Sequence, residues 1–382
     1  MPGVPQSSSV TGVMSSSPAT PVRQRLRRSF ATPLNAALTV AMLVLLAVVA
    51  LPLLRWALLD ATWTGSANEC RAAEGGACWA FVGRKLEFIL FGLYPPEERW
   101  RPAAATALMI GLAAATAAPR MWRRWLVGAW VTALATAFWL MGGGAGLPRV
   151  PTRLWGGLPV TLMLTTVGLA AGFPLAVLLA LARRSRLALP RVGATALIEV
   201  VRGVPLIAVL YVAALVVPLA MPPGLEVDKL VLALAGITCF AAAYLAEAVR
   251  AGLQAVPRGQ QDAALALGLT SWQAKRLVVL PQALRVVIPS FVSIAVGFFQ
   301  DTSLVVIIGL FDLLNTARVA AQDPAWLGFH NEAYAFAAVI YFTGSASLSR
   351  YGLWLERRLG HDRRAPAAAS SANGGRIRGA AR

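Results

Sequence analysis

Eight long apolar stretches constrain this chain more than any other feature of its sequence. Each is long enough to cross about 30 Å of hydrocarbon, because an α-helix rises about 1.5 Å per residue. The stretches are residues 34–59, 103–119, 125–146, 158–182, 199–220, 230–249, 286–310 and 331–354. The second is short and rich in alanine. We therefore expect an all-α integral membrane protein with about eight transmembrane helices in the lipid bilayer.

Composition excludes several other classes of protein. Of the 382 residues, 57% are hydrophobic and 14% are charged, whereas soluble domains carry about 25% charged residues. The net charge is +18, but the arginines lie at the edges of the apolar stretches rather than on one soluble basic face, so we expect no nucleic-acid partner. Three cysteines are too few for a disulfide scaffold or a four-cysteine metal site.

The distribution of arginine and lysine predicts the orientation of the helices. If the N-terminus is cytoplasmic, 24 of the 35 basic residues fall in cytoplasmic segments and nine fall outside. Short cytoplasmic loops carry such an excess. Residues 1–29 read as a disordered tail, because the apolar run that follows is too long for the core of a cleaved signal peptide. We expect a multi-pass protein of the bacterial inner membrane with both termini in the cytoplasm.

The chain divides into two helical parts between two tails. Residues 30–147 hold three helices and an external loop at 60–101, and residues 155–357 hold five helices around one long cytoplasmic loop. A glycine-rich break at 141–148 separates the two parts, and residues 358–382 read as a disordered cytoplasmic tail. Neither part repeats the other, which is evidence against the repeat-built folds of common secondary transporters.

The long cytoplasmic loop predicts a rigid helical elbow. Pro257 starts a short helix, and Gly268 ends it in a left-handed conformation. Thr270 stands three residues before Gln273, which is the spacing of a capping box at the start of a second helix. Pro281 is expected to end or bend that helix. The small residues on the elbow would let the groove of another protein approach its backbone; the alternative is a connector that lies on the lipid headgroups.

Several ordered motifs resemble the permease subunits of ABC importers. The first is Asp262-Ala263-Ala264, three residues, Gly268, nine residues and Val278-Val279-Leu280-Pro281, which resembles the EAA motif of that family. The amino-acid branch is matched by Val200-Val201-Arg202-Gly203-Val204-Pro205, Glu247-Ala248-Val249-Arg250, Pro257-Arg258-Gly259-Gln260 and Gln300-Asp301-Thr302-Ser303-Leu304. Two departures are Asp262 in place of the usual Glu and Gln300 in place of the usual Lys. The loop at 60–101 contains Cys70-Arg71, Gly76-Ala77-Cys78-Trp79 and Phe91-Gly92-Leu93-Tyr94-Pro95, followed by Trp100-Arg101-Pro102. These motifs are similar to those of the M-type permeases of general L-amino-acid importers.

The resemblance implies a function and a set of partners. A periplasmic amino-acid-binding protein would deliver an L-amino acid. This chain would form half of a pore, and a sister permease of different sequence would form the other half as a heterodimer. Cytoplasmic ABC ATPase subunits would bind ATP and magnesium, so this chain would carry no cofactor. The coupling residues implied by the motif are Asp262, Ala263, Ala264, Gly268, Leu280 and Pro281.

Charged and hydroxyl groups inside the apolar stretches are candidates for a substrate path. Asp301, with Thr302 and Ser303, lies in an otherwise apolar segment, where a charge normally faces the bundle interior or water. A carboxylate there suits the ammonium group of an amino acid; the alternatives are a structural pair with Arg202 or an interfacial position. Glu199 and Arg202 either line the path or pair with each other across one helical turn. Glu247 has a partner in Arg250 at the same spacing and is a gate or coupling candidate.

The three cysteines and the missing motifs complete the sequence-based predictions. An oxidising periplasm favours a disulfide between Cys70 and Cys78, and two free thiols are the alternative.

No P-loop, GxSxG, GxS or HExxH motif occurs, so we expect neither an ATPase nor a hydrolase on this chain and no metal site. Two alternative functions remain. One is a secondary amino-acid transporter driven by an ion gradient. The other is an intramembrane enzyme, whose only candidate acid and nucleophiles in the sequence would be Asp301 and the nearby hydroxyl groups.

Overall fold

The computed structural model describes residues 30–377 except 74 and 124, and it describes side chains up to residue 358. The predicted tail at 1–29 lies outside these residues. Within the described chain the regular structure is helical apart from the two-residue strand β1 (Phe311–Asp312). Contacts divide the chain into two units, which are described separately. The predicted all-α fold class is confirmed.

The first unit comprises Met1–Trp63 and Asn68–Ala77. Its helix α2 (Pro33–Leu54) starts at Thr32, whose hydroxyl accepts a hydrogen bond from the Asn35 N–H at 3.2 Å, and continues into a π-helical turn, η1 (Arg55–Leu59). None of the α2 residues is buried within the chain. An apolar helix exposed on all sides is suited to lipid rather than water. Most of the short helix α3 (Ala67–Ala72) belongs to this unit.

The second unit comprises Thr64–Ala67 and Cys78–Arg382 and holds the other elements. Its longer helices are α4 (Trp79–Phe91), α5 (Trp100–Ala117), α6 (Trp125–Gly142), α7 (Gly157–Arg183), α8 (Ala188–Gly203), α11 (Lys229–Ala255), α12 (Arg258–Ala266), α14 (Leu280–Asp301), α15 (Leu313–Ala320) and α16 (His330–Ile377). Shorter pieces are η2 (Pro96–Glu98), η3 (Pro119–Met121), η4 (Thr152–Leu154), α9 (Leu206–Tyr211), η5 (Val212–Val216), α10 (Val217–Leu219), α13 (Ser271–Gln273), η6 (Ala274–Val279), η7 (Thr302–Ile308) and η8 (Pro324–Trp326).

The centre of this unit is the contact between α7 and α11. A Cβ atom on Gly168 would lie 2.5 Å from the Ile237 side chain, and one on Gly172 would lie 2.9 Å from the Cβ atom of Ala241. These two glycines therefore let the helices approach more closely than larger residues would, which is the packing role expected of a small-xxx-small pair. Helices α8, α14 and α9 cover the same pair, and Phe240 and Phe298 fill the space between α11 and α14.

Five helical segments among the described residues are long and apolar enough to cross a membrane alone. They are Pro33–Leu59, Trp125–Gly142, Gly157–Arg183, Lys229–Ala255 and Ser271–Ile308. Helices also occupy the predicted spans 103–119 and 331–354, as α5 and α16, but neither meets the same criterion. The count of eight spans is therefore not confirmed.

The predicted span at 199–220 is not one continuous helix. The structure has two helical segments there, Ala188–Gly203 and Leu206–Leu219, which meet at a bend of 109°. Pro205 cannot donate a backbone hydrogen bond, and it holds Val204 in an extended conformation with φ −115° and ψ 149°. A proline and the residue before it therefore break the helix where the apolar pattern continues.

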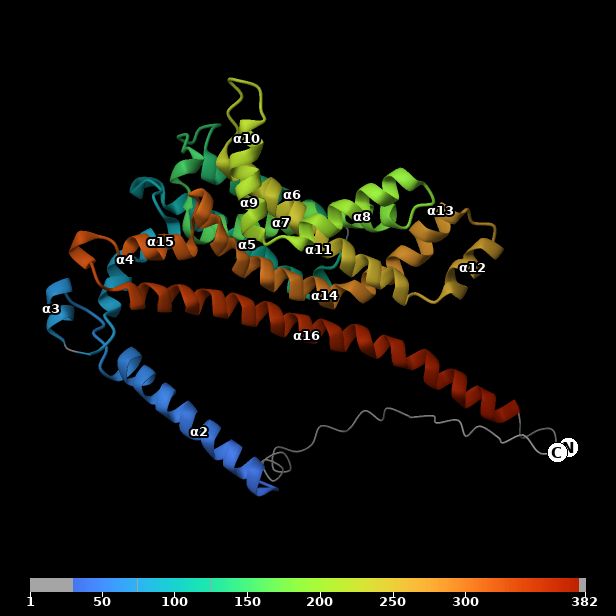
Figure 1. Cartoon of the computed structure of the whole chain (residues 1–382), viewed down its shortest axis with the longest axis horizontal. Helices are drawn as coiled ribbons and strands as arrows, with labels where there is room; N and C mark the ends of the chain where they lie inside the picture. Colours follow the sequence, from blue (N-terminus) through green and yellow to red (C-terminus); the bar gives the residue numbers. More distant parts are fainter. Residues whose placement is uncertain (1–29, 74, 124, 378–382) are drawn as a thin grey trace. The chain divides into compact units, whose positions relative to one another are not determined.

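The two ends of the second unit carry different elements. Figure 1 shows α12 and α13 together at one end of the bundle, and α4 and α15 at the opposite end. Helix α16 continues to Ile377 and so includes most of the segment that the sequence analysis assigns to a C-terminal tail. That segment is rich in alanine, which has the highest helix propensity.

Candidate functional site

The elbow between α11 and α14 has the local structure that the sequence predicts. Gly268 follows α12 with φ +84°, and the N–H groups of Gly268 and Leu269 donate to the carbonyls of Leu265 and Ala264 at 3.0 and 3.2 Å. This pair of bonds is a Schellman motif. Thr270 and Gln273 form both bonds of a capping box, at 2.8 and 3.3 Å. The end of α12 and the start of α13 are thus each capped by hydrogen bonds formed within the turn.

The two arms of the elbow pack against each other. Helix α12 lies against the π-helical turn η6, where Ala264 and Ala274 are 3% and 0% exposed. Gln282 donates from Nε2 to Oε1 of Gln260 at 3.2 Å and adds a second link. Ala264 therefore faces the other arm, and the expectation that it opens the elbow to a partner is wrong for this residue. Its small side chain lets the arms come together instead.

The outer surface of the elbow carries apolar side chains that the sequence analysis missed. Leu267 is 85% exposed and Trp272 is 58% exposed, on either side of the Gly268 turn. Asp262 and Ala263 are exposed beside them. The signal in the sequence is Leu267 at the C-cap position, directly before the glycine that ends the helix.

Of the two outcomes expected at Pro281, an end or a bend of the helix, the end is not present. The helix runs without a break from Ser271 through η6 and α14 to Asp301, with Leu280 half-buried and Pro281 exposed in its first turn. The π-helical turn at Ala274–Val279 widens the helix just before the proline, which accommodates its ring and its missing N–H group. The elbow is consequently continuous with α14 and with the segment that carries Asp301.

A charged hub joins α7, α8 and α11 near the elbow. We define it as Arg183, Glu199, Arg202, Glu247 and Arg250. The guanidinium of Arg183 donates to Glu199 at 2.7 Å and to Glu247 at 3.3 Å. Glu247 also accepts from Nε of Arg250 at 2.9 Å and lies 3.8 Å from Arg202. Three helices are therefore tied together by ion pairs around one carboxylate.

The hub differs from the pairs that the sequence suggests. The Glu247–Arg250 pair is confirmed, but Glu199 pairs with Arg183 rather than with Arg202. Arg202 pairs with Glu247 and lies over the ring of Tyr244 at 5.5 Å. Arg183 is separated from its partners by 16 and 64 residues, so no spacing rule within one helix reveals it.

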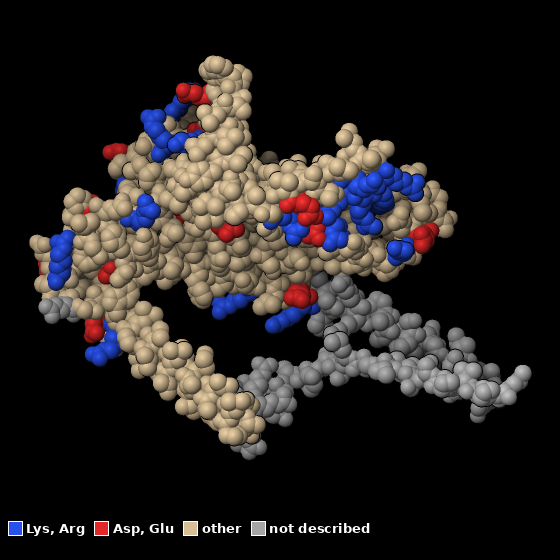
Figure 2. Space-filling model, viewed as in Figure 1, with Lys and Arg blue, Asp and Glu red and all other residues tan. Residues whose placement is uncertain are grey.

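Figure 2 shows charged side chains gathered toward the ends of the bundle and a largely uncharged middle.

The Asp301–Ser303 motif lies where α14 passes into the 3₁₀ segment η7. The Asp301 side chain is half-buried, and no ion pair of Asp301 occurs within the described part of the chain. Thr302 is 1% exposed and donates to the Phe299 carbonyl at 2.8 Å. The structural pairing of Asp301 with Arg202, which was one alternative, is therefore not present, because Arg202 belongs to the hub.

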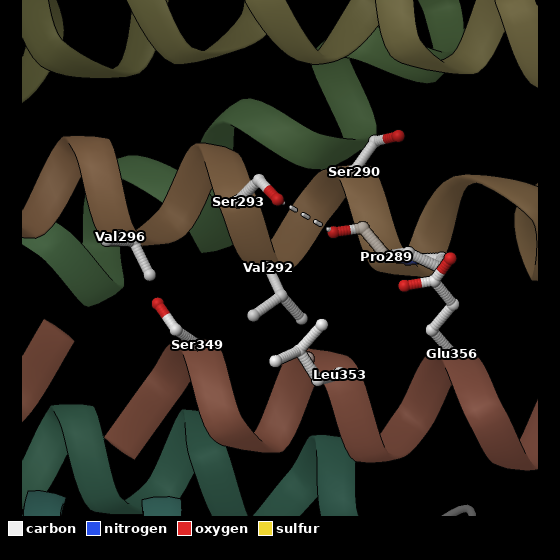
Figure 3. Close-up of a pocket in the computed structure, with 9 residues that line it drawn as sticks. Pro289, Ser290, Val292, Ser293, Val296, Ser349, Leu353 and Glu356 are labelled. Atoms are coloured by element: carbon white, nitrogen blue, oxygen red, sulfur yellow. Dashed lines mark hydrogen bonds between the residues drawn. The ribbon is translucent and has the colours of Figure 1, made fainter. Parts of the chain in front are cut away.

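Two open pockets follow the seam between α14 and α16. One, of about 350 Å³, borders the motif and is lined by Gln300, Ser303, Leu314, Ala338, Tyr341 and Phe342. Gln300 also donates to the hydroxyl of Ser345, in α16, at 3.0 Å. The other pocket, of about 470 Å³, lies farther along α14, where Ser349 and Leu353 of α16 lie opposite Val292 and Val296 (Figure 3). The Ser293 hydroxyl, which also lines it, donates to the Pro289 carbonyl at 3.4 Å. Hydroxyl and amide groups thus line a seam within a membrane-spanning segment, where such groups normally face protein or water.

The cysteines have different states. Cys70 and Cys78 are each disulfide-bonded, and Cys239 is a free thiol. Among the described residues no cluster of three or more His, Cys, Asp or Glu side chains is arranged to hold a metal ion.

Comparisons with known proteins place these features in context. Residues 172–361 match the family model described as the inner membrane component of binding-protein-dependent transport systems. The chain is 44% identical over 344 residues to the inner membrane amino-acid ABC transporter permease protein YhdY of Escherichia coli K12, an alignment that covers 88% of this chain and 92% of YhdY. The same share of this chain is 36% identical to the Rhodobacter capsulatus glutamate/glutamine/aspartate/asparagine transport system permease protein BztC, of which 93% is covered.

A shorter relative matches only part of the chain. The glutamate/aspartate import permease protein GltK of Escherichia coli O6:H1 is 37% identical over 218 residues, which are 95% of GltK but 56% of this chain. Nearly all of that permease therefore aligns with little more than half of the present sequence.

Proposed function

The chain belongs to the family of inner membrane components of binding-protein-dependent transport systems, and we propose that it is the permease subunit of an ATP-driven importer of L-amino acids. Members of this family are transport components of the inner membrane that work with a separate ATPase and a substrate-binding protein. The resemblance seen in the sequence is therefore confirmed. The cargo is proposed from the relatives, which are amino-acid permeases by name.

The elbow is the observation that carries this proposal. It is a rigid turn with both helix ends capped, it projects from the end of the bundle, and it presents Leu267 and Trp272 to solvent. Exposed apolar side chains on a rigid turn favour a protein partner. We propose that this partner is the ATPase, and that it contacts the exposed Asp262, Ala263 and Gly268 together with these two side chains.

Movement of the elbow has a direct route to the substrate path in this proposal. The second arm is one continuous helix from Ser271 to Asp301, so a displacement at Gly268 reaches Asp301 through a rigid element. The carboxylate of Asp301 would attract the ammonium group of the amino acid, and Gln300 and Ser303 would offer hydrogen bonds. Arg202 and Glu199 belong to the hub, so we propose that they control the inner end rather than contact the substrate.

The remaining parts of the importer are assigned by the same proposal. A sister permease, different from this chain, would supply the other half of the pore, and a periplasmic receptor would deliver the amino acid. ATP and magnesium would bind the ATPase subunits, and this chain would hold no cofactor. Both termini would lie in the cytoplasm, with residues 30–147 as an accessory part and 155–357 as the permease core.

Purification from the native membrane in mild detergent tests this function. The proposal expects a P-loop ATPase and a second permease to copurify, and the reconstituted complex should take up amino acids only with ATP and a receptor. The alternative is a secondary amino-acid transporter that works alone. A solitary chain that catalyses uptake driven by an ion gradient would replace the proposal with that alternative.

A further inference from the structure

Helix α4 is held at its N-terminus by the permease core. The N–H group of Cys78 donates to Oε1 of Glu332, at the start of α16, over 3.0 Å, and Glu332 is 6% exposed. A carboxylate is favoured at a helix N-terminus, where N–H groups lack partners within the helix. Phe81 is fully buried and packs against the rings of Trp326 and Phe329, with centroids 5.9 and 6.0 Å away.

The C-terminal end of α4 is held by backbone contacts. The hydroxyl of Thr316, in α15, donates to the carbonyl of Ile89 over 2.7 Å. A Cβ atom on Gly92 would lie 2.8 Å from the Cα atom of Gly156, and one on Gly157 would lie 2.0 Å from the Leu90 carbonyl. The segment after α4 therefore touches the start of α7 so closely that no side chain fits between them.

From α15 a chain of hydrogen bonds continues to the Asp301–Ser303 motif. Asp312 caps α15 by accepting from the N–H groups of Leu314 and Asn315, each at 3.0 Å, and it is 0% exposed. The same carboxylate accepts a hydrogen bond from the Tyr341 hydroxyl at 3.0 Å, and that hydroxyl lies 3.5 Å from the hydroxyl of Thr302. Burial of both Asp312 and Thr302 makes this arrangement specific, because an unpaired buried polar group is unfavourable.

We infer that α4 is a positioning element of the transport path. By holding α15 through Thr316, it sets the place of Asp312 and Tyr341, and these two residues set the place of Thr302 in the motif. Tyr341 also lines the pocket beside Gln300 and Ser303, so a shift of α15 changes the pocket wall. The inference assigns a role to the accessory part of the chain, and it depends on the proposed place of Asp301–Ser303 in the path.

The substitution Thr316→Val tests the inference in the whole complex. It keeps the volume of the side chain and removes the hydrogen bond to Ile89, together with one to Leu313 at 2.9 Å. In proteoliposomes with ATPase, sister permease and receptor, we expect faster amide hydrogen exchange in residues 79–91. The maximal uptake rate should fall about two- to thirtyfold, while the half-saturating concentration of loaded receptor stays the same. Thr343→Val is the matched control, since within the described part of the chain its hydroxyl bonds only to Val339 of its own helix.

A second variant approaches the same contact from the other side. Gly92 has φ +66° and faces Gly156, so Gly92→Ala should also release the end of α4 and lower the maximal rate. Unchanged amide hydrogen exchange in residues 79–91 of both variants would overturn the inference. Faster amide exchange with an unchanged maximal uptake rate would overturn it as well. A higher half-saturating receptor concentration with a normal maximal rate would show that α4 is a receptor platform instead. Absence of ATP-driven uptake by the unaltered complex would contradict the proposed function itself.

Discussion

Arg183, the last residue of α7, donates a hydrogen bond to Glu199 of α8 over 2.7 Å. Its other amino group reaches Glu247 of α11 at 3.3 Å, so one side chain connects three helices. The 109° bend between α8 and α9 begins at Gly203, directly after Arg202, which also pairs with Glu247. Any movement of α8 about this bend must therefore break or rearrange ion pairs of the hub.

The first prediction concerns Arg183→Gln. Partly exposed ion pairs contribute up to about 1 kcal/mol each, so we expect the complex to assemble with normal yield. Loss of the pairs to Glu199 and Glu247 should release α8 and lower uptake per ATP hydrolysed. Arg184→Gln is the control, because Arg184 is exposed and has no ion pair among the described residues. The number of amino acids taken up per ATP hydrolysed is measured in proteoliposomes for both variants. Equal values for Arg183→Gln and Arg184→Gln would contradict a coupling role of the hub.

The second prediction concerns Gly268, which has φ +84° and open space where a Cβ atom would be. A residue other than glycine in this conformation costs about 1–3 kcal/mol, which a large bundle tolerates. Gly268→Asp should therefore insert normally but place a charge between Leu267 and Trp272 and weaken the contact with the ATPase. ATP hydrolysis should then become independent of substrate.

The neutral variant Gly268→Asn separates charge from strain in this experiment, because asparagine tolerates the left-handed region equally well. It should retain more coupling than Gly268→Asp. Normal ATP-driven uptake by the aspartate variant would argue against the elbow as the coupling element.

Local signals made the elbow predictable, whereas the hub depends on tertiary structure. Gly268 and the Thr270–Gln273 pair specify their own hydrogen bonds within a few residues, so their pattern is legible in the sequence. Arg183 finds Glu247 across 64 residues, and only the packing of α7 on α11 brings the two together. The sequence left open whether Pro281 ends or bends the helix, because the π-helical turn before it, which accommodates the ring, has no recognisable sequence pattern.

The third prediction concerns Asp301, which has no ion pair in the described structure and lies beside the pocket at Gln300 and Ser303. Asp301→Asn keeps the shape and removes the charge. A charge-assisted hydrogen bond contributes about 1.5–3 kcal/mol, so the maximal uptake rate should fall on the order of tenfold or more. Ser293→Ala, in the other pocket, is the control. Equal rates for Asp301→Asn and the unaltered complex would remove Asp301 from the path.

The fourth prediction concerns the cysteines and the orientation of the chain. In a Cys239→Ser background, a membrane-impermeant maleimide applied from outside should label Cys70 and Cys78 only after reduction, because both are disulfide-bonded. Labelling without a reductant would indicate free thiols. Labelling that requires access from the cytoplasmic side would reverse the proposed topology.

The fifth prediction concerns the pH dependence of the contact between α4 and the loop before α16. Lys85 donates a hydrogen bond to Asp323 and holds the pKa of that carboxyl below its usual value, with help from the Ala325 N–H. A carboxyl with a lowered pKa stabilises the fold at pH values above its unfolded pKa of about 3.9. This contribution is lost as the pH falls through the lower, folded pKa. The protection factor of the amides in residues 79–91, which is corrected for the intrinsic pH dependence of exchange, should therefore be constant near neutral pH. It should fall relative to that of Asp323→Asn only under acidic conditions, since the asparagine variant has no proton to bind. A parallel pH response of the two proteins would show that the Lys85–Asp323 pair does not stabilise α4.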